Sequence, residues 1–243
     1  MPWRLSGVSR TRRSFVEQLR GILLSPGVGF HEIGEEDLRR GVLIILVIGL
    51  LSSWAGVVYL SKTEFDLSSM VQRGPSGFGP RGRFFNSGAS SPDIDPDAFR
   101  RTLMPFIAFG GMVGAFTRWL VPSVLLLIAA KILIGDVRSK RMLAMTAFAS
   151  LPQLAQQLLR VVDAYTISTG DLIALRTPLF PSTSLLLSAL NQAVKVFNVF
   201  GLLTMALTVY AISANNGTQR GRSLTVVVIA YFAYVVLRTV LPI

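Results

Sequence analysis

Hydrophobic residues gather in long runs along this chain, and the first run, residues 41–60, contains no charged side chain. About 20 apolar residues are enough for a helix to cross the roughly 30 Å hydrocarbon core of a bilayer. Further runs of this kind occupy residues 112–134, 141–162, 194–214 and 223–241. The pattern therefore predicts about five membrane spans.

Segments that cross a bilayer must satisfy their own backbone hydrogen-bonding groups, because the hydrocarbon core contains no water to do so. These runs lack the short alternating pattern of a membrane β-barrel, so they are predicted to be helices. The predicted fold class is all-α: a polytopic transmembrane helical bundle formed by residues 41–243 and preceded by an N-terminal segment, residues 1–40. The composition agrees, since the chain is 51% hydrophobic and only 15% charged.

The N-terminal segment contains an amphipathic pattern between residues 14 and 24. Phe15, Leu19, Ile22 and Leu23 fall on one helical stripe, and charged residues lie largely opposite, before the sequence Ser-Pro-Gly ends the pattern. We expect a short amphipathic helix lying on the inner leaflet of the membrane. A helix packed against the bundle is the alternative. In the first case, the residues that contact the leaflet are Arg12, Arg13, Phe15 and Arg20.

The region between the first two spans, residues 61–101, is rich in Gly, Pro, Ser and Asn and is predicted to be a flexible external loop. Near its end, Asp95 followed by Pro96 is typical of a helix N-terminus, so a helix is expected to begin there. Gly110 and Gly114 are spaced four residues apart, which predicts a close helix crossing at this point, within or between chains.

Lys and Arg residues are unevenly distributed between the two sides of the predicted bundle. Thirteen flank one set of span ends, including the short loop between Lys131 and Arg141, and seven lie on the other side. Because basic residues favour the cytoplasmic side, the N-terminus is predicted to be cytoplasmic and the C-terminus outside. The net charge of +11 is therefore attributed to contacts with anionic lipid headgroups, and no nucleic-acid partner is expected.

Four basic residues lie inside the predicted spans rather than at their ends: Arg118, Arg160, Lys195 and Arg238. Measured along each helix at about 1.5 Å per residue, they lie roughly 21–28 Å from the cytoplasmic end, in the outer third of the bilayer. Long cationic side chains at this depth can extend to the outer headgroups, so they are expected to act as anchors. The alternative is that some of them converge on an outward-facing pocket that binds an anionic headgroup or a small anion.

Several amide side chains are also placed within the predicted spans. Gln153, Gln157, Asn191 and Asn198 are candidates for a polar path through the bundle. Hydrogen bonding between neighbouring helices is the simpler interpretation of these residues. No acidic residue lies near a bilayer midplane, which argues against a proton relay built on carboxylates.

The sequence offers little for catalysis or metal binding. It contains no cysteine and a single histidine, His31, which lies outside the spans. Thiolate zinc sites and cysteine nucleophiles are therefore excluded, and no nucleophile, base and orienting group can be assembled from the spans. No catalytic residue, metal ligand or cofactor is predicted.

Several short motifs follow one another along the chain from residue 23 onward. They are Leu24-Ser-Pro26 with Phe30 and Glu32 before the first span, residues 147–152 (AFASLP), residues 196–201 (VFNVFG) leading into residues 202–210, and Asn216-Gly-Thr218 with Gly221-Arg-Ser223 before the last span. Together they resemble the Yip1 domain family of five-span membrane proteins. The resemblance implies a cytosolic N-terminus and an external or lumenal C-terminus, in agreement with the charge distribution.

Eukaryotic relatives in this family act in vesicle traffic between the endoplasmic reticulum and the Golgi and associate with prenylated small GTPases and with one another. Only about 40 residues precede the first span here, fewer than in the trafficking members, so a prokaryotic plasma-membrane protein is favoured. We expect a non-enzymatic scaffold or adaptor that organises membrane partners or lipids. Its candidate partners are anionic lipids, membrane or cytoplasmic proteins, and further copies of the chain. A small transporter or channel is the alternative.

Overall fold

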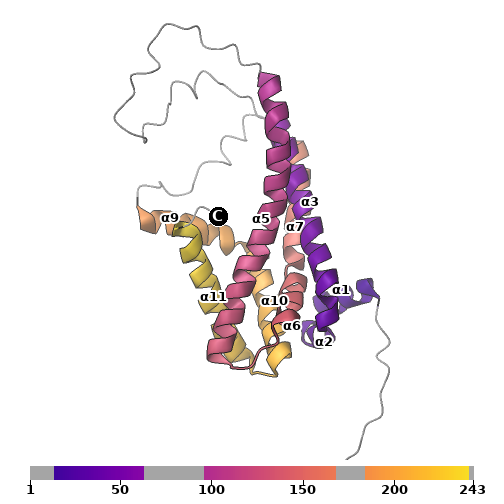
Figure 1. Cartoon of the computed structure of the whole chain (residues 1–243), viewed down its shortest axis with the longest axis vertical. Helices are drawn as coiled ribbons and strands as arrows, with labels where there is room; N and C mark the ends of the chain where they lie inside the picture. The colour runs from indigo at the N-terminus through magenta and orange to yellow at the C-terminus, as the bar shows by residue number, and fades with distance from the viewer. Residues whose placement is uncertain (1–13, 63–95, 168–183, 241–243) are drawn as a thin grey trace, which may run out of the picture.

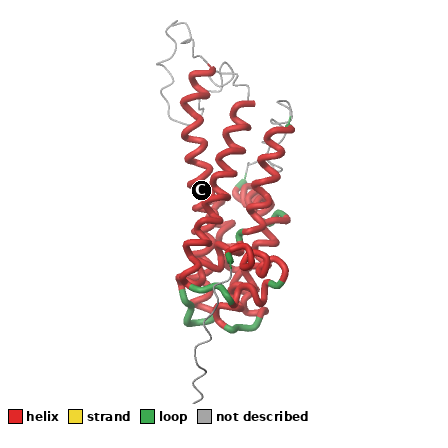
Figure 2. The backbone as a smooth tube through the Cα atoms, turned by 90° about the vertical axis from the view of Figure 1, so that its right-hand side faces the viewer, coloured by secondary structure: helices red, strands yellow, loops and turns green. Residues whose placement is uncertain are grey.

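The computed structural model describes residues 14–62, 96–167 and 184–240. In these residues every regular element is a helix, which confirms the predicted all-α class. Long helices lie side by side (Figure 1). The turns at residues 134–138 and 217–219 lie at one end of the molecule, which we call the inner end. The view turned by 90° shows helices that extend well beyond the compact inner end (Figure 2).

Among the described residues, four helices are long and apolar enough to cross a membrane. They are α3 (Leu38–Lys62), α5 (Pro96–Leu133), α10 (Val199–Asn216) and α11 (Arg220–Val240). α5 begins at Pro96, so its first turn occupies the end of the predicted loop 61–101. Residues 63–95 of that loop lie outside the described residues.

The predicted span at residues 141–162 is divided into two helices, α6 (Ser139–Ala149) and α7 (Leu151–Thr166), which meet at Ser150. Pro152 explains the break, because proline lacks an N–H and its ring would clash with the carbonyl four residues earlier in a continuous helix. The apolar run predicted one helix, whereas the proline inside it ends one helix and starts another.

The predicted span at residues 194–214 is also divided, since it begins in α9 (Leu185–Val196) and continues into α10. α9 lies across the long helices rather than along them (Figure 1). Asn198 lies between the two helices, and its Oδ1 accepts a hydrogen bond from the backbone N–H of Gly201 at 2.8 Å. This side-chain cap starts a new helix, because it satisfies a backbone donor in the first turn of α10.

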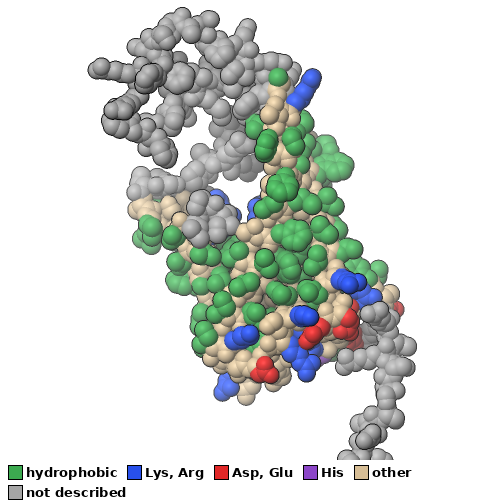
Figure 3. All heavy atoms as spheres, viewed as in Figure 1, with side chains coloured by type: hydrophobic (Ala, Val, Ile, Leu, Met, Phe, Trp, Pro, Cys, Tyr) green, Lys and Arg blue, Asp and Glu red, His purple; other side chains and the backbone are tan. Residues whose placement is uncertain are grey.

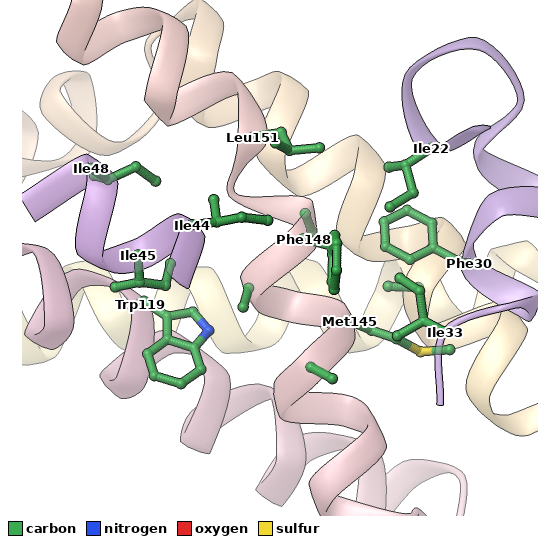
Figure 4. Packing of buried hydrophobic residues seen from close by; sticks show 14 of the residues in the cluster. Ile22, Phe30, Ile33, Ile44, Ile45, Ile48, Trp119, Met145, Phe148 and Leu151 are labelled. Carbon is green, nitrogen blue, oxygen red and sulfur yellow. The ribbon is translucent and has the colours of Figure 1, made fainter. Parts of the chain in front are cut away.

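Two N-terminal helices, α1 (Phe15–Leu24) and α2 (Pro26–His31), pack against the inner end of the bundle. Ile22 and Phe30 are fully buried there together with Phe148 of α6 (Figure 4). α1 is therefore the predicted amphipathic helix, and its buried face contacts protein.

The residues predicted to contact the inner leaflet are placed differently from one another. The ring of Phe15 lies 6.2 Å from that of Phe148, so this side chain faces the bundle, as in the packed-helix alternative. Arg20 is exposed, whereas Arg12 and Arg13 lie outside the described residues. The large apolar side chains that α1 leaves exposed are Val16, Leu23 and Leu24. Leaflet contact by this exposed face stays a prediction.

A buried carboxylate ties α1 to the start of α3. Asp37 is 4% exposed and accepts hydrogen bonds from Arg40 at 3.0 Å and from Gln18 of α1 at 3.4 Å. Arg40 also donates to the side-chain oxygen of Gln18 at 3.0 Å. Because the members of this triad are paired with one another, the buried charge is compensated and fixes α1 on the bundle.

α3 and α5 approach each other closely where Gly111 faces Ser53. A Cβ added to Gly111 would lie 2.7 Å from the Cα atom of Ser53, so glycine is required there. The sequence predicted the crossing from Gly110 and Gly114, but a Cβ at either position would meet nothing within 4 Å. The closest approach within the chain is therefore at Gly111 of this segment, because spacing along one helix does not fix how that helix is rotated toward its neighbour.

Apolar side chains cover the long face of the bundle, and charged side chains gather in a band at the inner end (Figure 3). Large hydrophobic residues on the surface are strongly exposed, for example Ile132 at 75% and Phe106 at 71%. Such exposure is expected of helices that are surrounded by hydrocarbon rather than by water.

Replacing Gly111 with leucine is expected to destabilise the bundle by about 2 kcal/mol, because the new side chain must push α3 away. In a thermal unfolding measurement on the detergent-solubilised protein, this corresponds to a midpoint lowered by roughly 5 °C. Gly110→Leu is the matched control, since its Cβ meets open space one residue away. Equal midpoints for the two variants would contradict the crossing at Gly111.

Candidate functional site

Cationic side chains from four helices line one cavity of about 130 Å³, away from the inner end. Arg118 comes from α5, Arg160 from α7, Lys195 from α9 and Arg238 from α11. These are the four basic residues that the sequence places inside spans. The structure therefore brings all four to one cavity, as the alternative of an outward-facing pocket requires.

The positive charge at this cavity is not balanced by carboxylates of the described chain. No described Asp or Glu lines the cavity, and none of those described forms an ion pair with the four basic side chains. The guanidinium group of Arg118 is repelled by those of Arg160 and Arg238. Because like charges that line one cavity repel one another, the cavity favours an anion.

Three of the four predicted polar-path residues, Gln153, Gln157 and Asn198, line the same cavity. The fourth, Asn191, is buried in α9 and is not part of the lining. Gln157 is 3% exposed, and its Oε1 atom has no hydrogen-bond partner among the described residues. Since buried amide oxygens are normally paired, a donor that enters the cavity and reaches this atom would supply the missing hydrogen bond.

The N-terminus of α10 also faces the cavity, through Asn198 and Gly201. Asn198 caps this helix, and its Nδ2 donates to the carbonyl of Lys195 at 2.9 Å. The asparagine therefore fixes the backbone from which Lys195 projects. Because a helix N-terminus carries a partial positive charge, α10 adds to the field of the four cations.

Sequence reasoning missed two aromatic residues of the cavity, Tyr231 and Tyr234 of α11. Both are buried. The sequence did contain a signal for them. Tyr231, Tyr234 and Arg238 are spaced by three and then four residues, and positions at this spacing fall on one helix face. The polar residues of α7 that line the cavity show the same period.

An aromatic and polar layer follows the cavity residues along α3 and α7, farther from the inner end. Trp54 Nε1 donates to the hydroxyl of Tyr165 at 2.9 Å and so joins the two helices. Tyr59 donates to Asp163 at 2.7 Å, and Lys62 donates to the carbonyl of Tyr165 at 2.6 Å. Trp and Tyr are enriched where hydrocarbon meets headgroups, so the composition of this layer is typical of a membrane interface.

Apolar side chains fill the bundle between the cavity and the inner end. One buried cluster contains Ile44, Ile45, Trp119 and Phe148, and a second contains Leu126, Val226 and Val227 (Figure 4 shows the first). A polar pair buried in this region is joined internally, since Ser123 Oγ donates to Thr146 Oγ1 at 2.9 Å. Within the described residues, the polar lining of the cavity is therefore separated from the inner end by apolar packing.

A family model described as the Yip1 domain matches residues 20–241. The chain belongs to the Yip1 domain family. In the comparisons with curated proteins and with solved structures, nothing matches. Together with the apolar helices, the family match identifies this Yip1 protein as an integral membrane protein.

The Yip1 domain begins inside α1, so it includes half of the N-terminal segment that the sequence analysis set apart from the bundle. Two motifs that carry the resemblance lie at helix breaks. Residues 147–152 contain the α6–α7 junction, and residues 196–201 contain the α9–α10 junction. Gln153 directly follows the first motif, and Asn198 belongs to the second, so both motifs in this Yip1 protein border the cavity.

In this Yip1 protein, Asn198→Ala is expected to lower the free energy of unfolding by about 1 kcal/mol, because α10 loses its side-chain cap. Asn198→Asp keeps the capping oxygen, loses the hydrogen bond to the carbonyl of Lys195, and places a carboxylate among four cations, whose attraction is expected to outweigh that loss. Its thermal unfolding midpoint in detergent should therefore equal or exceed that of the unchanged protein.

The matched control is Ser184→Asp, which places the same charge at the cap of α9, outside the cavity. This variant tests whether a carboxylate at any helix N-terminus has the same effect. If Asn198→Asp were as unstable as Asn198→Ala, the charge imbalance at the cavity would be refuted.

Proposed function

We propose that this Yip1-family protein is a non-enzymatic membrane scaffold that holds an anionic group, a lipid headgroup or a small oxyanion, in its cationic cavity. The observation that carries the proposal is the convergence of Arg118, Arg160, Lys195 and Arg238 on a lining without a described carboxylate. Arg and Lys bind phosphate and carboxylate groups through charge-assisted hydrogen bonds, which are stronger than neutral ones.

Anchoring in the membrane does not by itself require this convergence. Cationic side chains that extend to headgroups can do so independently, each toward the nearest part of the membrane surface. Side chains that share one cavity repel one another, and an anion between them offsets that repulsion. The amides of Gln153 and Gln157 and the N-terminus of α10 add further polar contacts for such an anion.

The scaffold part of the proposal rests on the family and on the exposed face of α1. Arg20 lies there beside the apolar residues Val16, Leu23 and Leu24. A basic and apolar surface suits anionic lipids of the inner leaflet, and protein partners or a second copy of the chain are further candidates. The described lining of the cavity contains no Asp, Glu, His or Cys, which favours a non-enzymatic role.

A small transporter or channel is the second candidate, because Gln153, Gln157 and Asn198 give the cavity neutral polar walls. Transport would also require a polar route to the inner end. The described residues there form two buried apolar clusters instead, so the scaffold is favoured.

Replacing Arg118 and Lys195 together with glutamine should weaken the binding of anionic lipids at least tenfold, because each charge-assisted hydrogen bond contributes roughly 1.5–3 kcal/mol. Native mass spectrometry of the purified protein, titrated with phosphatidylglycerol, measures the change. Arg39→Gln combined with Lys131→Gln is the matched control, since it removes the same charge from exposed positions outside the cavity. Unchanged lipid retention in the first double variant would dismiss the cavity as an anion site.

We further propose that the inner end faces the cytoplasm of a prokaryotic cell and that the C-terminus lies outside. The charged band at the inner end favours this orientation (Figure 3). Because the chain contains no cysteine, Lys140→Cys and Arg101→Cys each provide a unique label site. A membrane-impermeant maleimide added to intact cells should label Arg101→Cys and leave Lys140→Cys unlabelled. The reverse pattern would invert the proposed topology.

A further inference from the structure

Gln157 of α7 lines the cavity although its side chain is only 3% exposed. Its Oε1 atom accepts no hydrogen bond from any described residue, even though Arg118, Arg160 and Lys195 line the same cavity and carry donors. A buried amide oxygen without a donor is unfavourable, so a group bound in the cavity is stabilised by donating to this atom.

The groups around the cavity favour two properties in one ligand. The four cations favour negatively charged oxygens, and the oxygens of a phosphate diester accept hydrogen bonds but cannot donate them. Oε1 of Gln157 favours a neutral donor close to the negative group. A phosphate diester that carries a short hydroxylated headgroup has both properties.

Lipid is the most direct source of such a group at this depth. A neighbouring hollow of about 420 Å³ shares Arg160 with the cavity and is lined in part by Leu159, Val162 and Phe200. The acidic residue of this hollow, Asp163, is already hydrogen-bonded by a tyrosine of α3. Apolar surface directly beside cationic surface suits an amphiphile better than a free anion.

We propose that the cavity binds a hydroxyl-bearing phospholipid of the outer leaflet, with its phosphate diester among the four cations and a headgroup hydroxyl donating to Oε1 of Gln157. This inference rests on the proposed anion site and adds the class of its ligand. In this arrangement the cations supply affinity for the phosphate, and Gln157 distinguishes one headgroup from another.

Two lipids of equal charge separate these roles, since phosphatidylglycerol carries headgroup hydroxyls and phosphatidylmethanol carries none. The purified full chain is titrated with each lipid, and binding is measured by native mass spectrometry. The unchanged protein should bind phosphatidylglycerol about fivefold more tightly, which is the effect of one neutral hydrogen bond. In Gln157→Leu this preference should vanish, so that the two lipids bind with equal affinity.

Gln192→Leu is the matched control. The Oε1 atom of Gln192 is also buried and unpaired among the described residues, but this side chain is not part of the cavity lining. The preference for phosphatidylglycerol should survive in this variant. The comparison of the two lipids on the unchanged protein tests the inference even if Gln157→Leu fails to fold.

The outcomes distinguish this inference from the proposed function. Equal affinity of the unchanged protein for the two lipids would overturn the hydroxyl contact and leave the anion site standing, whereas binding of neither lipid would overturn both. Glycerophosphoglycerol, the same headgroup without acyl chains, tests the source of the ligand. If it bound as tightly as the lipid, the cavity would belong to a soluble phosphate ester and the lipid inference would be overturned.

Discussion

Close backbone approach along α3 is the constraint on which the rest of the bundle depends. Helices in a bilayer associate through packing and hydrogen bonds rather than by leaving water, and small residues permit the necessary approach. α3 meets α6 at Gly41, where an added Cβ would lie 2.9 Å from that of Ala147, and meets α5 at Gly111. The contact at Gly41 lies near the inner end, whereas the contact between Gly111 and Ser53 lies at the level of the cavity, next to Ser52 of its lining.

The two helix breaks connect this packing to the polar chemistry. Irregular backbone at membrane depth is tolerated where it is buried in protein or lines a cavity, and the chain uses both solutions. Ser150, at the α6–α7 break, is 3% exposed, whereas Asn198, at the α9–α10 break, lines the cavity. The residues that interrupt the apolar runs therefore also supply polar groups, as in membrane proteins whose broken helices direct their N-termini toward anions.

Hydropathy and charge were sufficient to predict the all-α bundle and to single out the four cations, because both can be read along one helix at a time. The convergence of those cations depends on how four helices are rotated about their axes, which spacing within a helix does not determine. The breaks at Ser150 and Asn198 were hidden because a long apolar average extends across a proline or a capping asparagine. Phe15 was ambiguous because an apolar stripe suits a lipid surface and a protein surface equally.

The walls of the cavity belong to helices that are joined in different ways. α7 packs on α3 and α10, whereas α9 packs on α11, which in turn packs on α5 and α10. Arg160 therefore projects from a helix packed on α3, and Lys195 and Arg238 project from two helices packed on each other; α10 and the packing of α3 on α5 join the two sets. Like charges on two walls push those walls apart, and an anion that contacts both reverses the sign of the interaction. A ligand held by such a scaffold is thus also a structural counterion, so the lipid composition around the cavity and the packing of the C-terminal helices depend on each other.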